Sequence, residues 1–430
     1  LYAWNGNEYV FVKDIMWRSA LGMPLGIMGG TTAYAFADAS EEYLKIPGEL
    51  LMPKNGKYSI QMTDELWETI YFDEVQLIVL DHPDSVEVFV DERFSPPPYP
   101  EYRVHSVTEK RIPLSAKDGK GNDLLPFITK KDNKYISNFK KEQYQGITEM
   151  KDLILDPGKL SRTNNLYLFL NGWIFPTDAS INVAISQSGK TKLVPLHLQV
   201  INKDGQWETV IENLGFPPGK DKTIIANLSG KFMSEDHRVR IRTNMEIYWD
   251  YIFFSESHFK APLHTTRLRP VTADHHYRGF SRLYRKGGRY GPHWFDYGNV
   301  STNPIWRDLI GNYTRYGNVL ELLLHSDDKY IIANAGDETT IEFDASNIKD
   351  LPLGWKRDFL IFSVGWVKDG DLNTAKGQFV KPLPFHNMTK YPYGEEESYP
   401  TDKDHQKYLK KYNTRVVTNE KYRRAILDIK

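Results

Sequence analysis

Residues 166–187 read LYLFLNGWIFPTDASINVAISQ, and residues 359–378, FLIFSVGWVKDGDLNTAKGQ, repeat the same pattern. In each copy an apolar, strand-like run ends in Gly-Trp, at Trp173 and Trp366. Asp and Asn residues follow at matching positions once a length difference of two residues is allowed for. Self-similarity of this kind is the sequence signature of a repeated structural unit, so the chain is predicted to contain an internal duplication.

The similarity extends in both directions from these two stretches, as short motifs that recur in the same order. The matching pairs are residues 121–122 with 317–318, 132–136 with 327–331, 194–197 with 383–386 and, more weakly, IYWD at 247–250 with IYFD at 70–73. Each unit is therefore expected to have a first half and a second half.

The order of these halves predicts how the chain is connected. Residues 121–254 hold a first half followed by a second half, whereas the other second half lies near the N-terminus and the other first half near the C-terminus. A half-sandwich would leave an apolar face and sheet edges uncovered. We therefore expect residues 43–80 and 317–386 to pair as one discontinuous unit, with a contiguous unit inserted between them.

The local pattern of the chain predicts an all-β fold. Apolar and β-branched residues gather in runs of about 5–9 residues, the usual strand length of β-sandwiches, and residues 181–186 belong to this series. Helix signals are sparse, and the best covers residues 401–412, which Thr401 and Asp402 can cap. We predict two related, jelly-roll-like β-sandwich domains with little helix.

Composition excludes several classes of protein and partner. The chain has 430 residues, a net charge of -1 and no cysteine. The balanced charge gives no reason to expect a nucleic-acid partner, and the lack of cysteine excludes disulfides and thiolate metal sites. The apolar runs are far shorter than the ~20 residues that cross a bilayer, so no membrane insertion is expected. Since the sequence begins at Leu1, we expect a processed product or the ordered part of something longer.

A set of short pieces points to a family. The pieces are LYAWNGNEYVFVKD at 1–14, ELWETIYFDEVQLIVLDHP at 65–83, RGFSRL at 278–283, YTRYGNVLELL at 313–323, GWVKDGDLNTA at 365–375 and YNTR at 412–415. They resemble the C-terminal region of large secreted bacterial proteins with FG-GAP or VCBS propeller repeats, akin to the ASPIC/UnbV and cartilage-acidic-protein group. The resemblance implies an extracellular or cell-surface location and a role in adhesion or assembly. The calcium-loop signature of such propeller blades does not occur in residues 1–30.

The repeat and the resemblance together divide the chain into parts. Residues 1–25 are expected to end a propeller-like blade or to form a connector. Residues 26–95 plus 300–395 form the discontinuous β-sandwich, and residues 100–260 form the contiguous one. Residues 396–430 form a tail with one short helix.

The clearest candidate metal ligands follow the second Gly-Trp. Asp369, Asp371 and Asn373 place three oxygen donors at alternate positions of a turn, as a hard cation such as Ca²⁺ requires. The matching first copy has Ser180 in place of one carboxylate, and no Glu closes the loop. Side chains that cap a tight turn explain the same residues, so Ca²⁺ is a candidate ion with a structural alternative.

Two other sets of polar residues have the right chemistry without a clear spacing. The first could ligate a transition metal and the second could supply a glycosidase acid and base, although exposed loops and strand-face charges explain both. The first set is Asp274, His275, His276, His293 and Asp296, and the second is Asp64, Glu65, Glu68, Asp73 and Glu74.

Aromatic residues make up 13 % of the chain, either as sugar-stacking platforms or as core. We expect Trp173 and Trp366 to be buried at equivalent positions, because both lie in apolar strand patterns. The leading hypothesis is a non-catalytic, secreted module that binds another protein, a glycan or its own copies in a larger assembly. The alternative is a carbohydrate-active enzyme or a calcium-dependent, lectin-like domain. A concave groove with exposed aromatics and converging carboxylates favours a sugar site, whereas flat apolar patches favour assembly.

Overall fold

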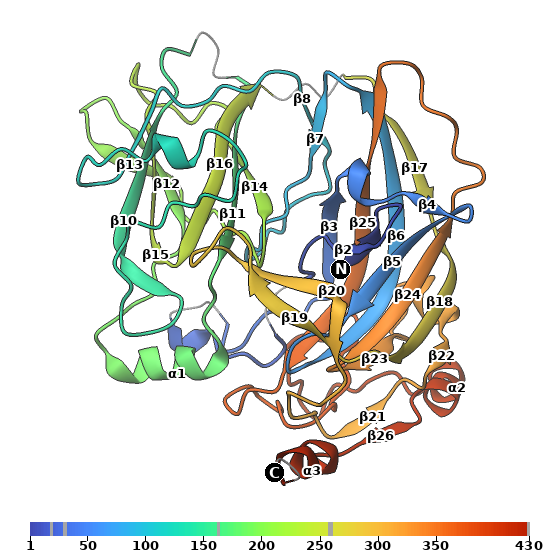
Figure 1. Cartoon of the computed structure of the whole chain (residues 1–430). Coiled ribbons are helices and arrows are strands. Elements are labelled where there is room, and N and C mark those ends of the chain that lie inside the picture. The colour runs from blue at the N-terminus through green and yellow to red at the C-terminus, as the bar shows by residue number, and fades with distance from the viewer. Residues whose placement is uncertain (18–19, 29–31, 161–163, 257–260, 428–430) are drawn as a thin grey trace.

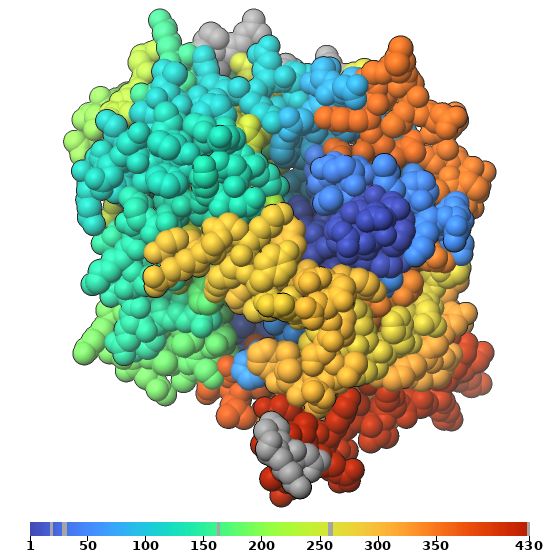
Figure 2. Space-filling model, viewed as in Figure 1, coloured from blue at the N-terminus to red at the C-terminus, as the bar shows by residue number. Residues whose placement is uncertain are grey.

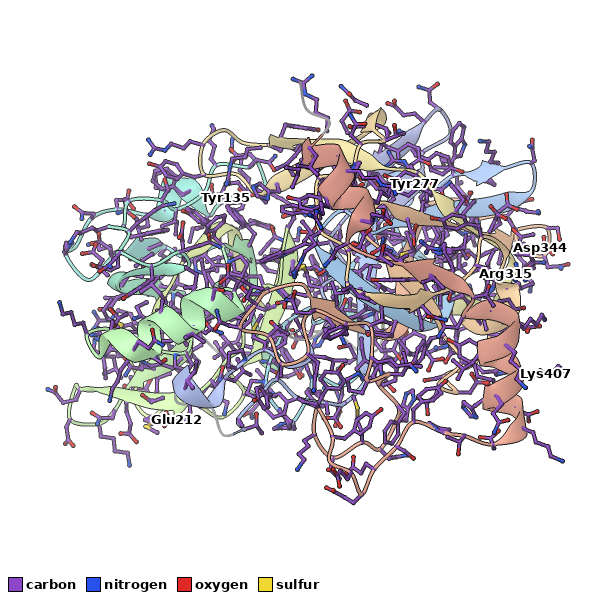
Figure 3. The ribbon with its side chains drawn as sticks, turned by 90° about the horizontal axis from the view of Figure 1, so that it is seen from below. Tyr135, Glu212, Tyr277, Arg315, Asp344 and Lys407 are labelled. Carbon is purple, nitrogen blue, oxygen red and sulfur yellow. The ribbon has the colours of Figure 1, made fainter. Side chains whose placement is uncertain are left out.

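The fold consists mostly of antiparallel strands, in a computed structural model that describes residues 1–17, 20–28, 32–160, 164–256 and 261–427. The predicted all-β class is confirmed. The strands gather into two units that lie side by side (Figure 1). Seen from below, Glu212 lies at the outer edge of one unit, and Asp344 and Lys407 lie at the far edge of the other (Figure 3).

The contiguous unit is a sandwich of two antiparallel sheets. Five strands in the order β13-β12-β15-β10-β9 face three strands in the order β14-β11-β16. Side chains from both sheets, such as Leu168 and Ile241, form one buried core. The strands are β9 (Ser115–Lys117), β10 (Ile147–Asp156), β11 (Leu166–Ile174), β12 (His197–Ile201), β13 (Trp207–Ile211), β14 (Lys222–Asn227), β15 (Val239–Met245) and β16 (Ile247–Glu256).

The discontinuous unit also has two sheets with a common core, to which Ile60 and Ile361 contribute. One sheet has the order β17-β6-β25-β3 with β23 beside β6, and the other has the order β2-β1-β5-β24-β18-β22 with β4 beside β5. The strands are β1 (Tyr2–Trp4), β2 (Tyr9–Phe11), β3 (Ser40–Ile46), β4 (Pro53–Lys54), β5 (Lys57–Thr63), β6 (Glu68–Pro83), β17 (His264–Leu268), β18 (Pro270–Tyr277), β22 (Gly317–Asn318), β23 (Ile331–Asn334), β24 (Asp337–Asp344) and β25 (Trp355–Asp369).

The strand pairing predicted between the two ends of the chain is confirmed. β25 lies between β6 and β3, β23 pairs with β6, and β24 pairs with β5. Two additions were not expected from the sequence. The N-terminal hairpin joins this unit because β1 pairs with β5, and β17 and β18 complete its two sheets.

The long central strands of the two units are paired in the same register. Trp173 lies opposite Tyr248 and Trp366 lies opposite Tyr71, and a bulge precedes the adjacent glycine in both cases. A Cβ at Gly172 would lie 2.3 Å from the Tyr248 carbonyl oxygen, and one at Gly365 would lie 2.4 Å from that of Tyr71. Only glycine permits such a close backbone approach. This shared geometry is what the predicted duplication requires, although the duplication itself stays a prediction.

The inner sheets of the two units face each other across a narrow ribbon of β7 (Glu87–Phe89) and β8 (His105–Val107). Alternation along β7 directs Val88 to the core shared with β6 and β25, and Phe89 to the rings of β11 and β16. Both faces of these central strands are therefore buried. Burial on both faces explains their continuous apolar runs, which lack the usual alternation.

One predicted strand is wrong, because residues 181–186 lie in helix α1 (Ala179–Ser188). The Asp178 carboxylate accepts a hydrogen bond of 2.7 Å from the Ile181 amide, and Gly189 ends the helix with a φ of 61°. An acidic N-cap and a left-handed C-terminal glycine are strong helix boundaries, and they override the β-branched residues between them.

The C-terminal tail differs from the prediction in one respect. Helix α2 (Lys403–Tyr412) is present and Asp402 caps it, as expected, but a second helix, α3 (Glu420–Leu427), follows. β26 (Arg415–Val417) pairs with β21 (Gly311–Tyr313) and ties the tail to the discontinuous unit. None of the α3 residues is buried, and Asn419 immediately before it is a favourable N-cap residue that the prediction did not use.

A hairpin of β19 (Phe280–Arg285) and β20 (His293–Ser301) crosses from the discontinuous unit onto the contiguous one, in gold in Figure 2. Its Tyr297 ring packs on Tyr2 at 4.9 Å, and Tyr290 near its turn lies 6.1 Å from Tyr248. The hairpin thus connects the two units. Among the described residues there are also four short 3-10 helices, namely η1 (Gly26–Met28), η2 (Gly48–Leu50), η3 (Leu125–Phe127) and η4 (Leu320–Leu323).

Both repeated tryptophans are buried as predicted, with exposed fractions of 4 % for Trp173 and 2 % for Trp366. Replacing either with alanine is expected to lower the free energy of unfolding by about 3–5 kcal/mol, through lost burial and a cavity. Urea denaturation measures this loss, with Trp207→Ala, at a partly exposed position of β13, as the control. A loss no larger than that of the control would contradict the structural role.

Candidate binding cleft

A cleft of about 550 Å³ lies where the two units and the N-terminal connector meet. Its wall is mostly apolar and comes from distant parts of the chain. The lining residues include Trp67, Glu68, Phe94, Phe216 and Asp369. Because it forms only when both units are in place, the cleft is a property of the tertiary structure.

Half-buried aromatic rings line this cleft. Phe94 and Phe216 stack with centroids 4.8 Å apart and exchange two backbone hydrogen bonds of 2.9 Å. These bonds fix the linker between the units against the contiguous unit. The ring centroids of Trp67 and Trp306 lie 6.1 Å apart. The Trp306 indole N–H donates a hydrogen bond of 3.0 Å to the Glu65 carbonyl oxygen. The rings are therefore held in place before any ligand binds.

Two carboxyl groups stand side by side on the wall of the cleft. Glu68 on β6 lies directly opposite Asp369 on β25, so the two side chains share one face of the sheet. Asp369 Oδ1 accepts hydrogen bonds from the Asp371 amide and the Thr374 hydroxyl. Within the described part of the chain, Glu68 has no hydrogen-bond or ion-pair partner.

Burial shifts the titration of both groups. It raises the pKa of Glu68 to about 8, with further increases from the charges of Asp369 and Asp14. It raises the pKa of Asp369 to about 6, against the hydrogen bond from Thr374. Burial therefore favours the protonated form of Glu68, which can donate a hydrogen bond, more strongly than that of Asp369.

The residues predicted to bind calcium lie at the end of β25, where Asp369 is its last residue, and in the turn that follows. Asp371 accepts from the Ser180 amide over 3.1 Å and from its hydroxyl over 2.7 Å, and the Asn373 amide group donates to the same hydroxyl over 2.9 Å. Asp371 also accepts from the Asn373 backbone amide over 2.7 Å. These bonds cap the turn and tie it to the first turn of α1. The calcium site stays a prediction.

The predicted histidine cluster is spread over separate places. Alternation along β18 buries His275, whose Nδ1 lies 3.0 Å from the Thr339 hydroxyl, and leaves His276 partly exposed beside Glu338. His293 and Asp296 belong to β20 of the connecting hairpin. The structure therefore does not bring these five residues together.

The five carboxylates near β6 also have separate roles. Glu65 accepts from the Tyr2 and Ser281 hydroxyls at 2.9 and 2.7 Å, and burial raises the pKa of Asp64 well above its usual range. Glu74 accepts from Gln76 over 2.7 Å. Glu68 lines the cleft, and Asp73 lies in a different group of residues.

That group was missed by the sequence analysis as a site. Among the described residues, Asp73, Asp328 and His386 offer ligand atoms that all lie within 4.8 Å of one another. The signal was present, since residues 327–331 and 383–386 belong to the repeated motifs. Their separation along the chain hid the cluster.

Comparisons of the chain with models of protein families, with curated proteins and with solved structures found no match. Within the described ranges, none of the helices is both long and apolar enough to span a bilayer.

The raised pKa of Glu68 predicts a pH dependence of stability. Between about pH 4.5 and pH 8 the folded chain keeps the Glu68 proton. The unfolded chain, whose pKa at this group is about 4.5, has already lost it in this range. The stabilisation from this proton is fully present below pH 4.5 and is lost by about pH 8. In between, the free energy of unfolding falls by up to about 1.4 kcal/mol per pH unit. Glu68→Gln should flatten the slope of unfolding free energy in this window, with Glu74→Gln on the same strand as control. Equal slopes in the wild type and Glu68→Gln would refute it.

Proposed function

We propose that this chain is a non-catalytic module of a larger extracellular assembly and that it binds a glycan in the cleft between its two units. The observation that carries the proposal is the concave, aromatic cleft with its adjacent carboxyl groups, Glu68 and Asp369. Within the binding roles expected from the sequence, such a site favours a small ligand over a flat assembly surface.

The chemistry of the wall suits a sugar. Pyranose rings present apolar C–H faces that pack on aromatic rings, here Trp67, Phe94 and Phe216. Their hydroxyl groups both donate and accept hydrogen bonds. Glu68, whose protonated form burial favours, and the more acidic Asp369 beside it offer a donor and an acceptor on the same wall. The volume of about 550 Å³ is within the usual range of small-molecule pockets.

A second candidate is a carbohydrate-active enzyme. The raised pKa of Glu68, at about 8, is the property expected of a general acid, and a second carboxyl group stands beside it. Glycoside hydrolysis, however, uses two carboxyl groups that flank the scissile bond. Glu68 and Asp369 lie on one strand pair and share one face, and Asp369 already accepts two hydrogen bonds. This arrangement supports binding more than catalysis.

The extracellular location is part of the same proposal, but its support is a sequence resemblance and not the shape of the cleft. It rests on the resemblance of residues 65–83, 313–323 and 365–375 to secreted propeller-repeat proteins. These pieces include β6 and the end of β25, which form the wall with Glu68 and Asp369. The proposed sugar site and the proposed secreted class therefore rest on overlapping segments.

Glycan-array screening followed by calorimetry tests this function. Trp67→Ala is expected to weaken binding of the best glycan at least about tenfold, because stacking area and a fixed wall are lost. Tyr284→Ala, at an exposed ring of β19, is the matched control and should bind as the wild type does. Glycan binding that Trp67→Ala leaves unchanged would place the site elsewhere.

The same preparation separates binding from catalysis. A non-catalytic module releases no product from the bound glycan over hours, and Glu68→Gln changes its affinity only modestly. Product release that Glu68→Gln abolishes would establish the enzyme instead.

A further inference from the structure

Three chelating side chains meet in the discontinuous unit, five residues along β6 from Glu68. Asp73 projects from β6, Asp328 stands in the turn before β23, and His386 follows β25 in the chain. His386 Nδ1 lies 2.7 Å from Asp328 Oδ1 and 3.8 Å from Asp73 Oδ2. Three separate segments thus supply one nitrogen and two carboxylates to a single point.

Each of these side chains is oriented by its surroundings. Asp73 Oδ2 accepts from the Asp328 amide over 3.2 Å, and Asp328 Oδ1 accepts from the His386 amide over 2.8 Å. The His386 ring packs edge-on against Trp366 at 5.0 Å, and its Nε2 lies 3.0 Å from the Ser326 hydroxyl. The bond to Ser326 leaves Nδ1 facing the two carboxylates. Such support by second-layer hydrogen bonds is typical of metal-ligating histidines.

A buried oxygen without a partner gives an independent indication of a ligand. Asp73 is fully buried, and among the described residues its Oδ1 has no hydrogen-bond partner. An unpaired carboxylate oxygen in the interior is costly and calls for an explanation. A cation that both carboxylate oxygens of Asp73 chelate supplies the missing interaction.

The contiguous unit has a matching loop, in which Asp250 stands at the position of Asp73 and Asn133 at that of Asp328. Its hydrogen bonds show which contacts the fold of the loop requires without a metal ligand set. Asp250 there accepts from the amides of Asp132 and Asn133 at 3.3 and 3.1 Å, as Asp73 does from Asp328. Asn133 and Asp328 share the same left-handed backbone, with a φ of 64°. The matching His197 turns its Nδ1 to the Pro195 carbonyl, 3.0 Å away. The cap is therefore common to both units, whereas the second carboxylate and the converging imidazole occur in one of them.

We propose that Asp73, Asp328 and His386 form a binding site for a divalent transition-metal ion of the Zn²⁺ class. A nitrogen and two carboxylates suit such an ion, whereas Ca²⁺ prefers oxygen ligands throughout. Tetrahedral bonds of about 2.0–2.2 Å place ligand atoms roughly 3.3 Å apart, so the observed 2.7 and 3.8 Å require shifts of well under 1 Å. Ser326 holds the histidine by accepting from its other ring nitrogen.

Metal titration of the tag-free chain tests this site, with ZnCl₂ in calorimetry and Co²⁺ as a spectroscopic probe. The wild type is expected to bind about one equivalent, to melt several degrees higher with Zn²⁺, and to give Co²⁺ visible absorption bands typical of low coordination number. Asp328→Asn, which installs the residue of the matching loop, and His386→Gln should each weaken binding at least about tenfold. Asp250→Asn removes the corresponding cap in the other unit and should leave metal binding unchanged.

Three outcomes would overturn the proposal. They are the absence of Zn²⁺ and Co²⁺ binding, binding that survives both Asp328→Asn and His386→Gln, and equal weakening by Asp250→Asn. Circular dichroism of every variant at the titration temperature distinguishes lost ligands from lost folding. The order Ser326, His386, Asp328 is also that of a hydrolytic triad. Labelling of Ser326 by a fluorophosphonate probe without metal binding would assign the cluster to that chemistry instead.

Discussion

The pairing of β25 with β6 is the interaction on which the rest of the structure depends. It runs from Trp355 opposite Pro83 to Asp369 opposite Glu68 and joins two segments that are far apart in the sequence. β3 then pairs with the free edge of β25, so a C-terminal strand lies inside an N-terminal sheet. The whole contiguous unit lies in the stretch of chain between β6 and β25. Neither end of the chain can bury its apolar face without the other.

Both candidate sites follow from this one pairing. At one end of β6, Glu68 is placed beside Asp369 and faces the cleft between the units. Five residues further along the same strand, Asp73 is the bulged residue, since Glu74 pairs with Val364 and Phe72 pairs with Gly365, and it meets Asp328 and His386. The bulge before Gly365 therefore positions Asp73 itself, and a slip of one residue in the register would displace both sites.

A buried network of charges fixes how the two units sit against each other, and with it the shape of the cleft. Glu92 accepts from the Lys13 ammonium group, from the Lys45 amide over 3.0 Å and from the Thr223 amide over 2.8 Å, so it joins the connector, β3 and β14. Lys220 lies over the Trp294 ring at 3.2 Å and donates to the Val12 carbonyl over 2.7 Å. Buried ionic contacts contribute orientation more than stability, because a shifted partner would leave a charge unpaired.

The sequence by itself determined the elements whose signals are local. Continuous apolar runs predicted the central strands, and Asp402 predicted α2. The repeated Gly-Trp motifs predicted that residues 43–80 and 317–386 pair. Where local signals compete, the prediction was wrong: the Asp178 cap and Gly189 make α1 out of residues whose β-branched character favours a strand.

Only the tertiary structure decided which polar residues act together. Asp369, Asp371 and Asn373 are close in sequence, but Asp371 and Asn373 turn to Ser180 of the other unit, which sequence spacing cannot show. The first position of β6 places Glu68 in the cleft, and that placement, through desolvation, gives it a raised pKa. Asp73, Asp328 and His386 come from three segments that are joined only after the sheets close. A site's chemistry depends on distance and burial in space, and a linear sequence specifies these only through the completed packing of its strands.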